Sequence, residues 1–276
     1  MQTLHPMTIN VRGNLMDLSE PKVMGILNVT PDSFFSPSRA QSEREVASRV
    51  EKMLEEGADI VDVGGCSTRP GSEPVSLDEE CQRVRWALSI VRRVAPEAVV
   101  SLDTFRAEVA RCCHEQFGIE ILNDISGGEA DGEMFSTVAD LNIPYVLTHS
   151  SDLSSSQEPL RDLLQQMGRK VAQLHEMGVK DVIVDPGFGF GKTLCQNYTI
   201  FHQLEVLHAL ECPLLVGVSR KSMVYKLLGQ TPETALNGTT VLHTLALEKG
   251  VHFLRVHDVK ECKEVLKILN TLRENA

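Results

Sequence analysis

The chain has none of the sequence features of a membrane or secreted protein. No window of its 276 residues approaches 18 consecutive apolar residues, and the first 20 residues lack a cationic segment followed by an apolar one. We therefore expect neither a membrane-spanning helix nor a secretory signal. Without either of these, the sequence predicts a soluble protein of the cytoplasm. Low-complexity segments and close internal repeats are absent too.

The cysteines and the net charge exclude further classes of protein. Seven cysteines, an odd number without a Cys-x-x-Cys pair, argue against a disulfide framework and against a thiolate metal site. A net charge of −11 repels phosphate polymers, and no basic stripe offsets it, so nucleic acid is not an expected partner. An anionic small substrate would have to be held by local arginines and lysines.

Eight short apolar runs, each ending on a polar residue, organise the chain. They are Met24–Asn28, Asp59–Asp62, Val99–Asp103, Ile119–Asn123, Pro144–His149, Val182–Asp185, Leu214–Ser219 and Phe253–His257. Their starts lie roughly 20–40 residues apart, which is the length of a strand, a helix and two loops. Continuous apolar strands that alternate with helices indicate a parallel sheet.

Eight such units predict an α/β fold, a (β/α)8 barrel, rather than an open doubly wound sheet. All eight strand ends carry a polar residue, as expected where every strand opens onto one central pocket. The even spacing leaves no room for a linker, so we expect one domain over residues 1–276. Within it, Thr8–Leu18 predicts a hairpin turning at Gly13-Asn14, and residues 1–20 would cap the end where the strands begin.

Two pairs of residues indicate helix starts after the first two strands. Ser42 with Glu45 and Ser76 with Glu79 have the spacing of capping boxes.

Residues 181–192 combine a buried strand with a glycine-rich turn. The strand ends on Asp185, which it would deliver to the mouth of the sheet, where ligands bind. The following turn, up to Lys192, resembles a nucleotide P-loop, but Pro186 stands where that motif requires glycine. We therefore do not expect ATP binding. The loops Asn28–Phe34 and Gly64–Gly71 join small residues and prolines to hydrogen-bonding groups, which suits loops that close over a ligand.

Five motifs in order make the chain resemble the dihydropteroate synthases over nearly its full length. They are Asn28–Phe34, Ser67–Gly71, Asp185–Lys192, Ser219–Lys221 and Arg255–Asp258. This family is a (β/α)8 barrel that joins 4-aminobenzoate to 6-hydroxymethyl-7,8-dihydropterin pyrophosphate and releases pyrophosphate with the help of Mg²⁺. The resemblance implies a transferase of folate biosynthesis that is a homodimer through its outer helices.

The residues suit that chemistry. A pterin presents an amide-amidine edge much like guanine, so buried carboxylates and an amide are its natural readers. Asp103, Asn123 and Asp185 provide them. The alternative for Asp103 and Asp185 is a buried ion pair at a strand end. The resemblance assigns Asp185 to the pterin amine and ring NH, with Lys221 on the carbonyl side and Arg255 beside the ring.

The resemblance also assigns the remaining substrate groups. The diphosphate is assigned to Asn28, Thr68, Arg69, Arg255 and His257, with Asn28 as the protein ligand of Mg²⁺. The 4-aminobenzoate site is assigned to Thr68, Pro70, Phe190, Ser219 and Lys221. The predicted catalytic group comprises Asp32, Thr68, Arg69, Asp103, Lys221 and Arg255. A single amide ligand is reasonable for Mg²⁺, which keeps most of its waters and shares phosphate oxygens. By itself, His257 would be an ordinary strand-end histidine.

A dissociative substitution fits these groups, because a reduced pterin can spread positive charge while the diphosphate leaves. Three positions depart from the family pattern: Cys66, Ser36-Pro37-Ser38, and Thr148-His149-Ser150, where methionines usually flank the histidine. None removes a predicted ligand. Two alternatives are a pterin-binding methyltransferase that serves a corrinoid partner and a non-catalytic homologue. The methyltransferase does not explain Ser67–Gly71 or Ser219–Lys221, and the intact Asn28 and Arg69 argue against the homologue.

Overall fold

A ring of eight parallel strands forms the centre of the molecule. The structure is a computed structural model that describes residues 7–29, 39–66 and 75–275. The strands are β3 (Lys22–Asn28), β4 (Ile60–Gly64), β5 (Val99–Asp103), β6 (Ile121–Asp124), β7 (Tyr145–Thr148), β8 (Val182–Asp185), β9 (Leu215–Val216) and β10 (Phe253–Val256). They pair in the order β8-β7-β6-β5-β4-β3-β10-β9, and a parallel bridge between Val184 and Leu214 closes the ring. The predicted (β/α)8 barrel is confirmed.

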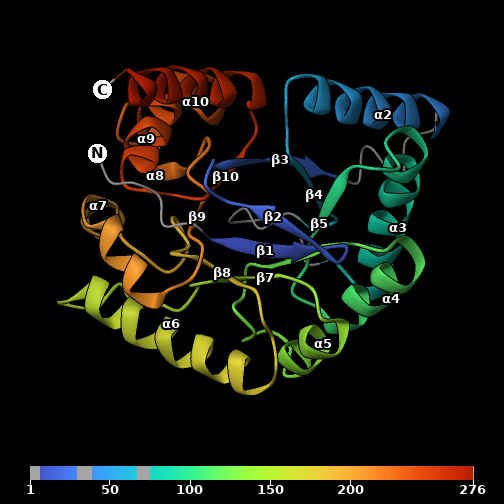
Figure 1. Cartoon of the computed structure of the whole chain (residues 1–276), viewed down its shortest axis with the longest axis horizontal. Coiled ribbons are helices and arrows are strands. Elements are labelled where there is room, and N and C mark those ends of the chain that lie inside the picture. Colours follow the sequence, from blue (N-terminus) through green and yellow to red (C-terminus); the bar gives the residue numbers. More distant parts are fainter. Residues whose placement is uncertain (1–6, 30–38, 67–74, 276) are drawn as a thin grey trace.

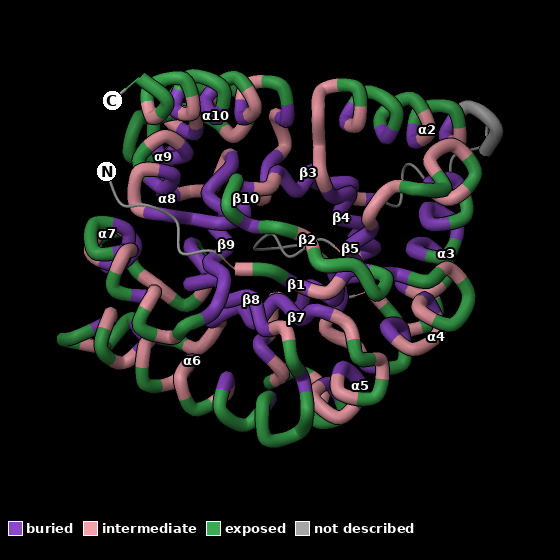
Figure 2. Tube along the Cα trace, in the orientation of Figure 1, coloured by how far each residue is buried: buried purple, intermediate pink, exposed green. Residues whose placement is uncertain are grey.

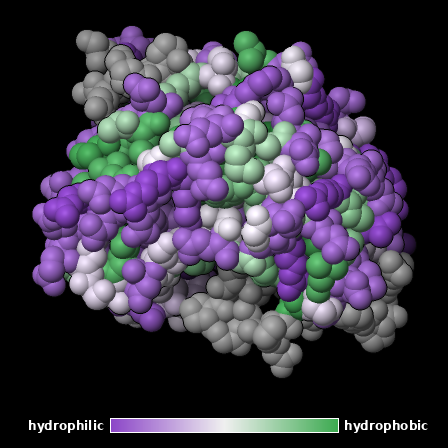
Figure 3. Space-filling model, turned by 90° about the horizontal axis from the view of Figure 1, so that it is seen from below, coloured by the Kyte–Doolittle hydropathy of each residue, from purple (hydrophilic) through white to green (hydrophobic). Residues whose placement is uncertain are grey.

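Helices surround the strands (Figure 1). They are α2 (Arg39–Glu55), α3 (Leu77–Val94), α4 (Ala107–Phe117), α5 (Met134–Leu141), α6 (Pro159–Glu176), α7 (Leu194–His202), α8 (Ser222–Tyr225), α9 (Leu236–Glu248) and α10 (Val259–Glu274), with short 3-10 helices at Leu204–Leu210 and Pro232–Thr234. Figure 2 shows buried strands at the centre and helices whose outer sides are exposed. The face in Figure 3 is mostly hydrophilic, with groups of hydrophobic residues among the polar ones.

The two predicted helix starts have different outcomes. Ser76 is the N-cap of α3, since its side chain accepts a hydrogen bond from Glu79 N at 3.2 Å. Ser42 is not a cap, because α2 already begins at Arg39 and buries Ser42 in its first turn.

An apolar layer fills the end of the barrel where the strands begin. Its side chains are Met24, Ile60, Ile121, Val146, Ile183, Leu215 and Phe253, and they pack against Ile9, Val11 and Leu18. The latter three come from the hairpin of β1 (Thr8–Val11) and β2 (Asn14–Asp17) and the residue that follows it, and the hairpin crosses the middle of the ring in Figure 1. The predicted cap is therefore present.

The hairpin turns one residue earlier than predicted. Val11 pairs with Asn14, so the turn residues are Arg12 and Gly13, with φ angles of 53° and 78°. Positive φ at both positions is the geometry of a tight two-residue hairpin turn. Arg12 forms an ion pair with the buried Glu120 and donates to Ala98 O at 3.0 Å. These contacts hold a non-glycine residue in the left-handed region.

Polar side chains replace apolar ones in the layers above. Successive inward-facing residues of a strand are two positions apart. Two positions beyond the apolar layer stand Ile26, Asp62, Asn123, Thr148, Asp185, Gly217 and Arg255, and two further on, at the strand ends, stand Asn28, Gly64, Ser219 and His257. Asp103 ends β5 in register with Gly64. The interior of the barrel is thus apolar at the amino ends of its strands and polar at the carboxyl ends.

Candidate active site

A hollow of about 450 Å³ lies at the carboxyl ends of the strands. It is lined by Ile26, Asn28, Cys66, Asp103, Phe188, Gly189, Phe190, Gly217, Ser219, Arg220, Lys221, Ser222, Tyr225, Lys226, Pro232, Arg255 and His257. This is the end at which (β/α)8 enzymes bind their substrates.

A buried ion-pair cluster forms the floor of the hollow. Arg255 donates from Nε to Asp62 at 2.6 Å and from Nη2 to Asp103 at 2.5 Å. The Asn123 amide donates to both oxygens of Asp62, at 3.2 and 3.3 Å. Burial raises the pKa of Asp103 to about 7, although the positive charge of Arg255 acts to lower it. Because Asn123 uses its NH₂ on Asp62, its carbonyl oxygen is left as an acceptor for a ligand.

Asp185 is a second buried acid with a different set of contacts. Its Oδ1 accepts a hydrogen bond from Gly187 N at 2.8 Å, and its side chain is not among those that line the hollow. Burial raises the pKa of Asp185, and the charge of Lys221 opposes this shift. The alternative interpretation of these acids as buried ion pairs therefore describes Asp103 but not Asp185.

Two lysines hold the glycine-rich loop after β8. Lys221 Nζ donates to Phe188 O at 2.6 Å and lies 4.5 Å from the centre of the Phe190 ring. Burial lowers the pKa of Lys221 to about 8, although Asp185 opposes the shift. Lys192 Nζ donates to three backbone oxygens, one of them His149 O at 3.0 Å, which ties the loop to the end of β7.

A side chain at Gly187 would clash with the end of β7. The φ of Gly187 is +65°, and a Cβ would lie 2.0 Å from His149 O. The backbone conformation therefore explains the glycine at this position of the motif.

The opposite edge of the hollow carries donors suited to an anion. Ser219 Oγ lies 3.0 Å from His257 Nδ1 and accepts a hydrogen bond from His257 N at 3.2 Å. Burial, followed by the charges of Arg255 and Arg220, lowers the pKa of His257 to about 4, so the imidazole is neutral. When the Ser219 hydroxyl donates to Nδ1, the ring proton is on Nε2, where it can meet a phosphate oxygen. Arg220 itself is paired with Asp258.

Asn28 stands at the end of β3 beside Gly64. A Cβ on Gly64 would lie 3.3 Å from the Asn28 amide oxygen, so the glycine leaves this oxygen room. Within the described ranges no group of three His, Cys, Asp or Glu side chains could hold a metal. The residues fit Mg²⁺ only as one neutral oxygen ligand, with water and substrate phosphate oxygens completing the shell.

The predicted site residues are brought together where the structure describes them. Those that line the hollow are Asn28, Asp103, Phe190, Ser219, Lys221, Arg255 and His257. Asn123 and Asp185 belong to the adjoining polar layer, and Asp32, Thr68, Arg69, Pro70 and Ser36–Ser38 lie outside the described residues. Sequence reasoning missed Asp62, and the signal for it was a lone acid at an inward position of an apolar strand.

The two described departures from the family pattern are both buried to some degree. Burial, together with the charge of Glu80 and a hydrogen bond with it, raises the pKa of the Cys66 thiol to about 12, so the thiol is protonated. Thr148 is 1% exposed, and its hydroxyl has no hydrogen-bond partner among the residues that the structure describes.

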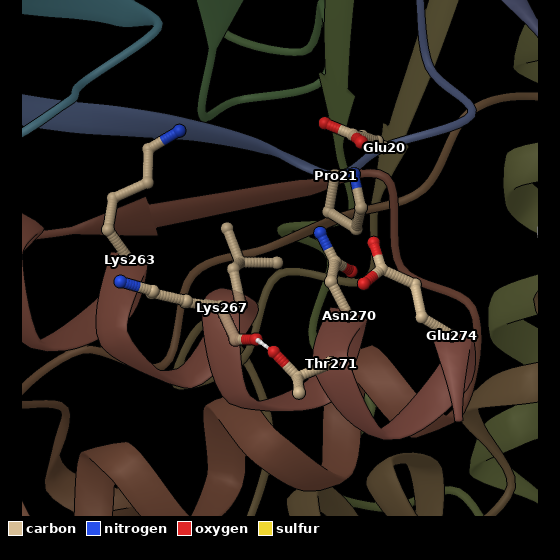
Figure 4. A pocket seen from close by; sticks show the side chains of 8 residues that line it. Glu20, Pro21, Lys263, Lys267, Asn270, Thr271 and Glu274 are labelled. Carbon is tan, nitrogen blue, oxygen red and sulfur yellow. Dashed lines mark hydrogen bonds between the residues drawn. The ribbon is translucent and has the colours of Figure 1, made fainter. Parts of the chain in front are cut away.

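A second hollow, of about 330 Å³, lies outside the barrel. Figure 4 shows that most of its lining side chains come from one helix, α10, facing Glu20 and Pro21. Its Thr271 hydroxyl is satisfied by Lys267 O of the same helix. Since no buried polar groups converge there, we assign the chemistry to the hollow at the strand ends.

Fold and site together are those of a barrel enzyme whose hollow offers acids and an amide for a small polar substrate and donors for an anion. A family model described as pterin binding enzyme matches residues 24–257. The dihydropteroate synthase of Escherichia coli (strain K12) is 38% identical over 274 residues, which cover 95% of this chain and 95% of that protein. The chain thus belongs to the dihydropteroate synthase family of pterin-binding enzymes.

Two solved structures have the same architecture. The dihydropteroate synthase of Xanthomonas albilineans with 4-aminobenzoic acid has a TM-score of 0.89 and 31% identity, over 98% of this chain and 99% of that chain. The same enzyme in complex with 7,8-dihydropteroate has a TM-score of 0.86 and 30% identity, over 97% and 99% of the two chains. Both solved structures thus share the fold of this chain over nearly its full length.

Proposed function

We propose that the chain is a transferase that condenses 6-hydroxymethyl-7,8-dihydropterin pyrophosphate with 4-aminobenzoate, giving 7,8-dihydropteroate and pyrophosphate. The observation that carries the proposal is the polar layer in which Asp103, Asn123 and Asp185 lie beside Lys221 and Arg255, beneath a hollow with further anion donors. Family membership supports the same reaction.

The pterin is assigned to the polar layer. Asp185 uses one oxygen on Gly187 N, so the other can accept from the ring NH and the exocyclic amine. The free carbonyl of Asn123 takes a neighbouring donor, and Lys221 donates to the pterin carbonyl. Asp103 adds negative charge on the far side of the ring.

The diphosphate is assigned to the rim of the hollow. Arg255 supplies the permanent charge, and His257 supplies a neutral donor. Asn28 would hold Mg²⁺, which when bound offsets the charge of the departing diphosphate. Thr68 and Arg69 keep their predicted roles in this group. Chelation by EDTA should weaken pterin pyrophosphate binding in the wild type and change it much less in Asn28→Ala, as titration calorimetry can measure.

The 4-aminobenzoate is assigned to the outer part of the hollow, next to Phe190, Ser219 and Lys221, with Thr68 and Pro70 as predicted neighbours. An aryl amine is already neutral, so no strong base is needed to activate it. The bond between the pterin CH₂ and the diphosphate oxygen breaks as Arg255 takes up the charge of the leaving group, and the acids Asp103 and Asp185 stabilise the resulting pterin cation. The amine nitrogen of 4-aminobenzoate then bonds to this CH₂ and releases one proton to water. Asp32 keeps its predicted role in ordering the first loop.

A coupled assay tests the proposal. With pterin pyrophosphate, 4-aminobenzoate and Mg²⁺, the protein should form equimolar dihydropteroate and pyrophosphate. A corrinoid-dependent methyltransferase would form neither, and a non-catalytic homologue would bind the pterin without turnover. Either of these results would refute the proposed condensation.

A homodimer through outer helices remains a prediction. Exposed apolar side chains on neighbouring helices support it: Val241 and Leu245 on α9, and Ile268 and Leu272 on α10. Burying them against a second copy would remove apolar surface from water. Sedimentation equilibrium should give twice the chain mass, and the double substitution Leu245→Lys with Ile268→Lys should give monomers.

Residues 1–276 are also proposed to form one pterin-binding domain, since one hydrophobic core runs from Val23 to Leu269. In the part of the chain that the structure describes, no helix is long and apolar enough to span a membrane. A cytoplasmic location stays a prediction.

A further inference from the structure

Glu80 is a fully buried acid that the proposed mechanism does not use. It lies in the first turn of α3, with 0% of its surface exposed. Its Oε2 accepts a hydrogen bond from Arg106 Nη1 at 2.6 Å, and its Oε1 accepts one from the Thr104 hydroxyl at 2.6 Å. An acid that is buried this completely needs such partners to be tolerated.

The partners of Glu80 are attached to parts of the active site. Thr104 directly follows Asp103, the acid that pairs with Arg255 in the floor of the hollow. The Cys66 thiol, which lines the same hollow, also lies against the Glu80 carboxylate. Glu80, on α3, therefore links the residues that follow β4 and β5 at their carboxyl ends.

Two arginines hold the chain on either side of residues 67–74: Arg106, which pairs with Glu80, and Arg83, which pairs with Glu79. Arg106, held by Glu80, donates from Nη2 to Val75 O at 2.6 Å. On the other side, Arg83 Nη1 donates to Gly65 O at 3.2 Å. A Cβ on Gly65 would lie 2.8 Å from Val84 and 3.2 Å from Glu80 O, so the chain runs in close contact with α3 at this point.

We propose that Glu80 is a positioning residue for the condensation. It never touches substrate. It fixes Asp103 through Thr104, Cys66 by direct contact and Val75 through Arg106. In the sequence, Thr68 and Arg69 stand between Cys66 and Val75, and both are predicted to bind substrate. This inference rests on the proposed function. A displacement of about 1 Å in such groups can cost on the order of a hundredfold in rate.

The chain offers a matched control at the other end of the same strand. Glu120 is also a buried acid, with pairs to Arg92 and Arg12, and it accepts a hydrogen bond from Val100 N at 2.7 Å. Glu80 and Glu120 thus hold opposite ends of β5 by the same kind of interaction. Only Glu80 does so beside the hollow.

The test compares Glu80→Gln with Glu120→Gln in the full chain. Both variants should lose thermal stability. Glu80→Gln should lower kcat by roughly tenfold to a hundredfold and raise KM for 4-aminobenzoate, measured at a temperature where both variants are folded. Glu120→Gln should stay within about twofold of the wild type in both constants. Equal kinetic losses in the two variants, or none in Glu80→Gln, would overturn the inference.

Hydrogen exchange separates this inference from the proposed function. Amides at Gly65–Cys66 and Val75–Ser76 should exchange faster in Glu80→Gln and unchanged in Glu120→Gln. If the wild type makes no dihydropteroate, the proposed function is wrong. If hydrogen exchange in Glu80→Gln is unchanged, the anchoring role of Glu80 is wrong, whatever the wild type makes. Should Glu80→Gln not fold, Thr104→Val, which removes the hydroxyl but not the shape, must show the kinetic loss, and Thr104→Ser must restore the rate.

Discussion

Replacing Asp185 by asparagine should separate substrate binding from stability. The carboxylate is buried at 6% exposure, and one of its oxygens is free to accept from the pterin. Asparagine keeps the shape but presents an NH₂ to a ligand donor, so at least one charge-assisted hydrogen bond is lost. Such a bond contributes about 1.5–3 kcal/mol, which corresponds to roughly a tenfold to a hundredfold rise in the Kd for pterin pyrophosphate.

Asp185→Asn should weaken binding of the pterin without lowering the stability of the protein. Burial raises the pKa of Asp185 in the folded protein. An acid with a raised folded pKa opposes folding once pH exceeds its unfolded pKa, because the folded state then resists ionisation. At pH about 8 the neutral variant should therefore have a melting temperature no lower than that of the wild type.

Titration calorimetry measures the binding, and Asp181→Asn is the control. Asp181 lies just before the other end of β8, where its carboxylate accepts from Asn10 N at 2.9 Å. Its replacement should leave the Kd within about twofold. Undiminished affinity of Asp185→Asn for pterin pyrophosphate would show that this carboxylate does not bind the pterin.

Three further predictions concern the same end of the barrel. Burial raises the pKa of Asp103 to about 7 and lowers that of Lys221 to about 8, so kcat/KM for pterin pyrophosphate should be highest between these values. Asp103→Asn should remove the acid limb, and a profile that is flat from about pH 6 to 9 would contradict both assignments. Thr148→Val should raise the free energy of unfolding by about 1 kcal/mol, since the buried hydroxyl has no partner within the described ranges. A lower free energy of unfolding in urea denaturation would disprove this. Gly187→Ala should cost at least about 2 kcal/mol through backbone strain and a clash, and more than Gly178→Ala, whose Cβ meets nothing within 4 Å; equal costs would show that the clash is relieved.

The sequence predicted the barrel because its pattern is local. Each apolar run and its polar end lie within a few residues, and parallel strands bring all their carboxyl ends to one side. That argument predicts that Asp103, Asn123 and Arg255 lie near one another. The structure confirms it through the cluster around Asp62.

The parts that sequence reasoning missed depend on distant residues. Arg255 is 193 residues from Asp62 and 152 from Asp103, so no local pattern predicts their ion pairs. The hairpin turn was predicted one residue late, because Gly13-Asn14 has good turn propensity whereas Arg12 needs Glu120 to hold its conformation. Ser42 failed as a cap because α2 extends one turn further toward its N-terminus.

The bridge that Arg255 makes between two acids has a consequence for ligand design. The guanidinium of Arg255 is paired with Asp103 and Asp62, so a compound resembling only the heterocycle must compete with an internal cation for Asp103. A compound that also carries a phosphate-like tail offers Arg255 another partner and releases the acid at the same time. The two fragments should therefore bind more tightly when joined than their separate affinities would suggest, beyond the usual gain from linking.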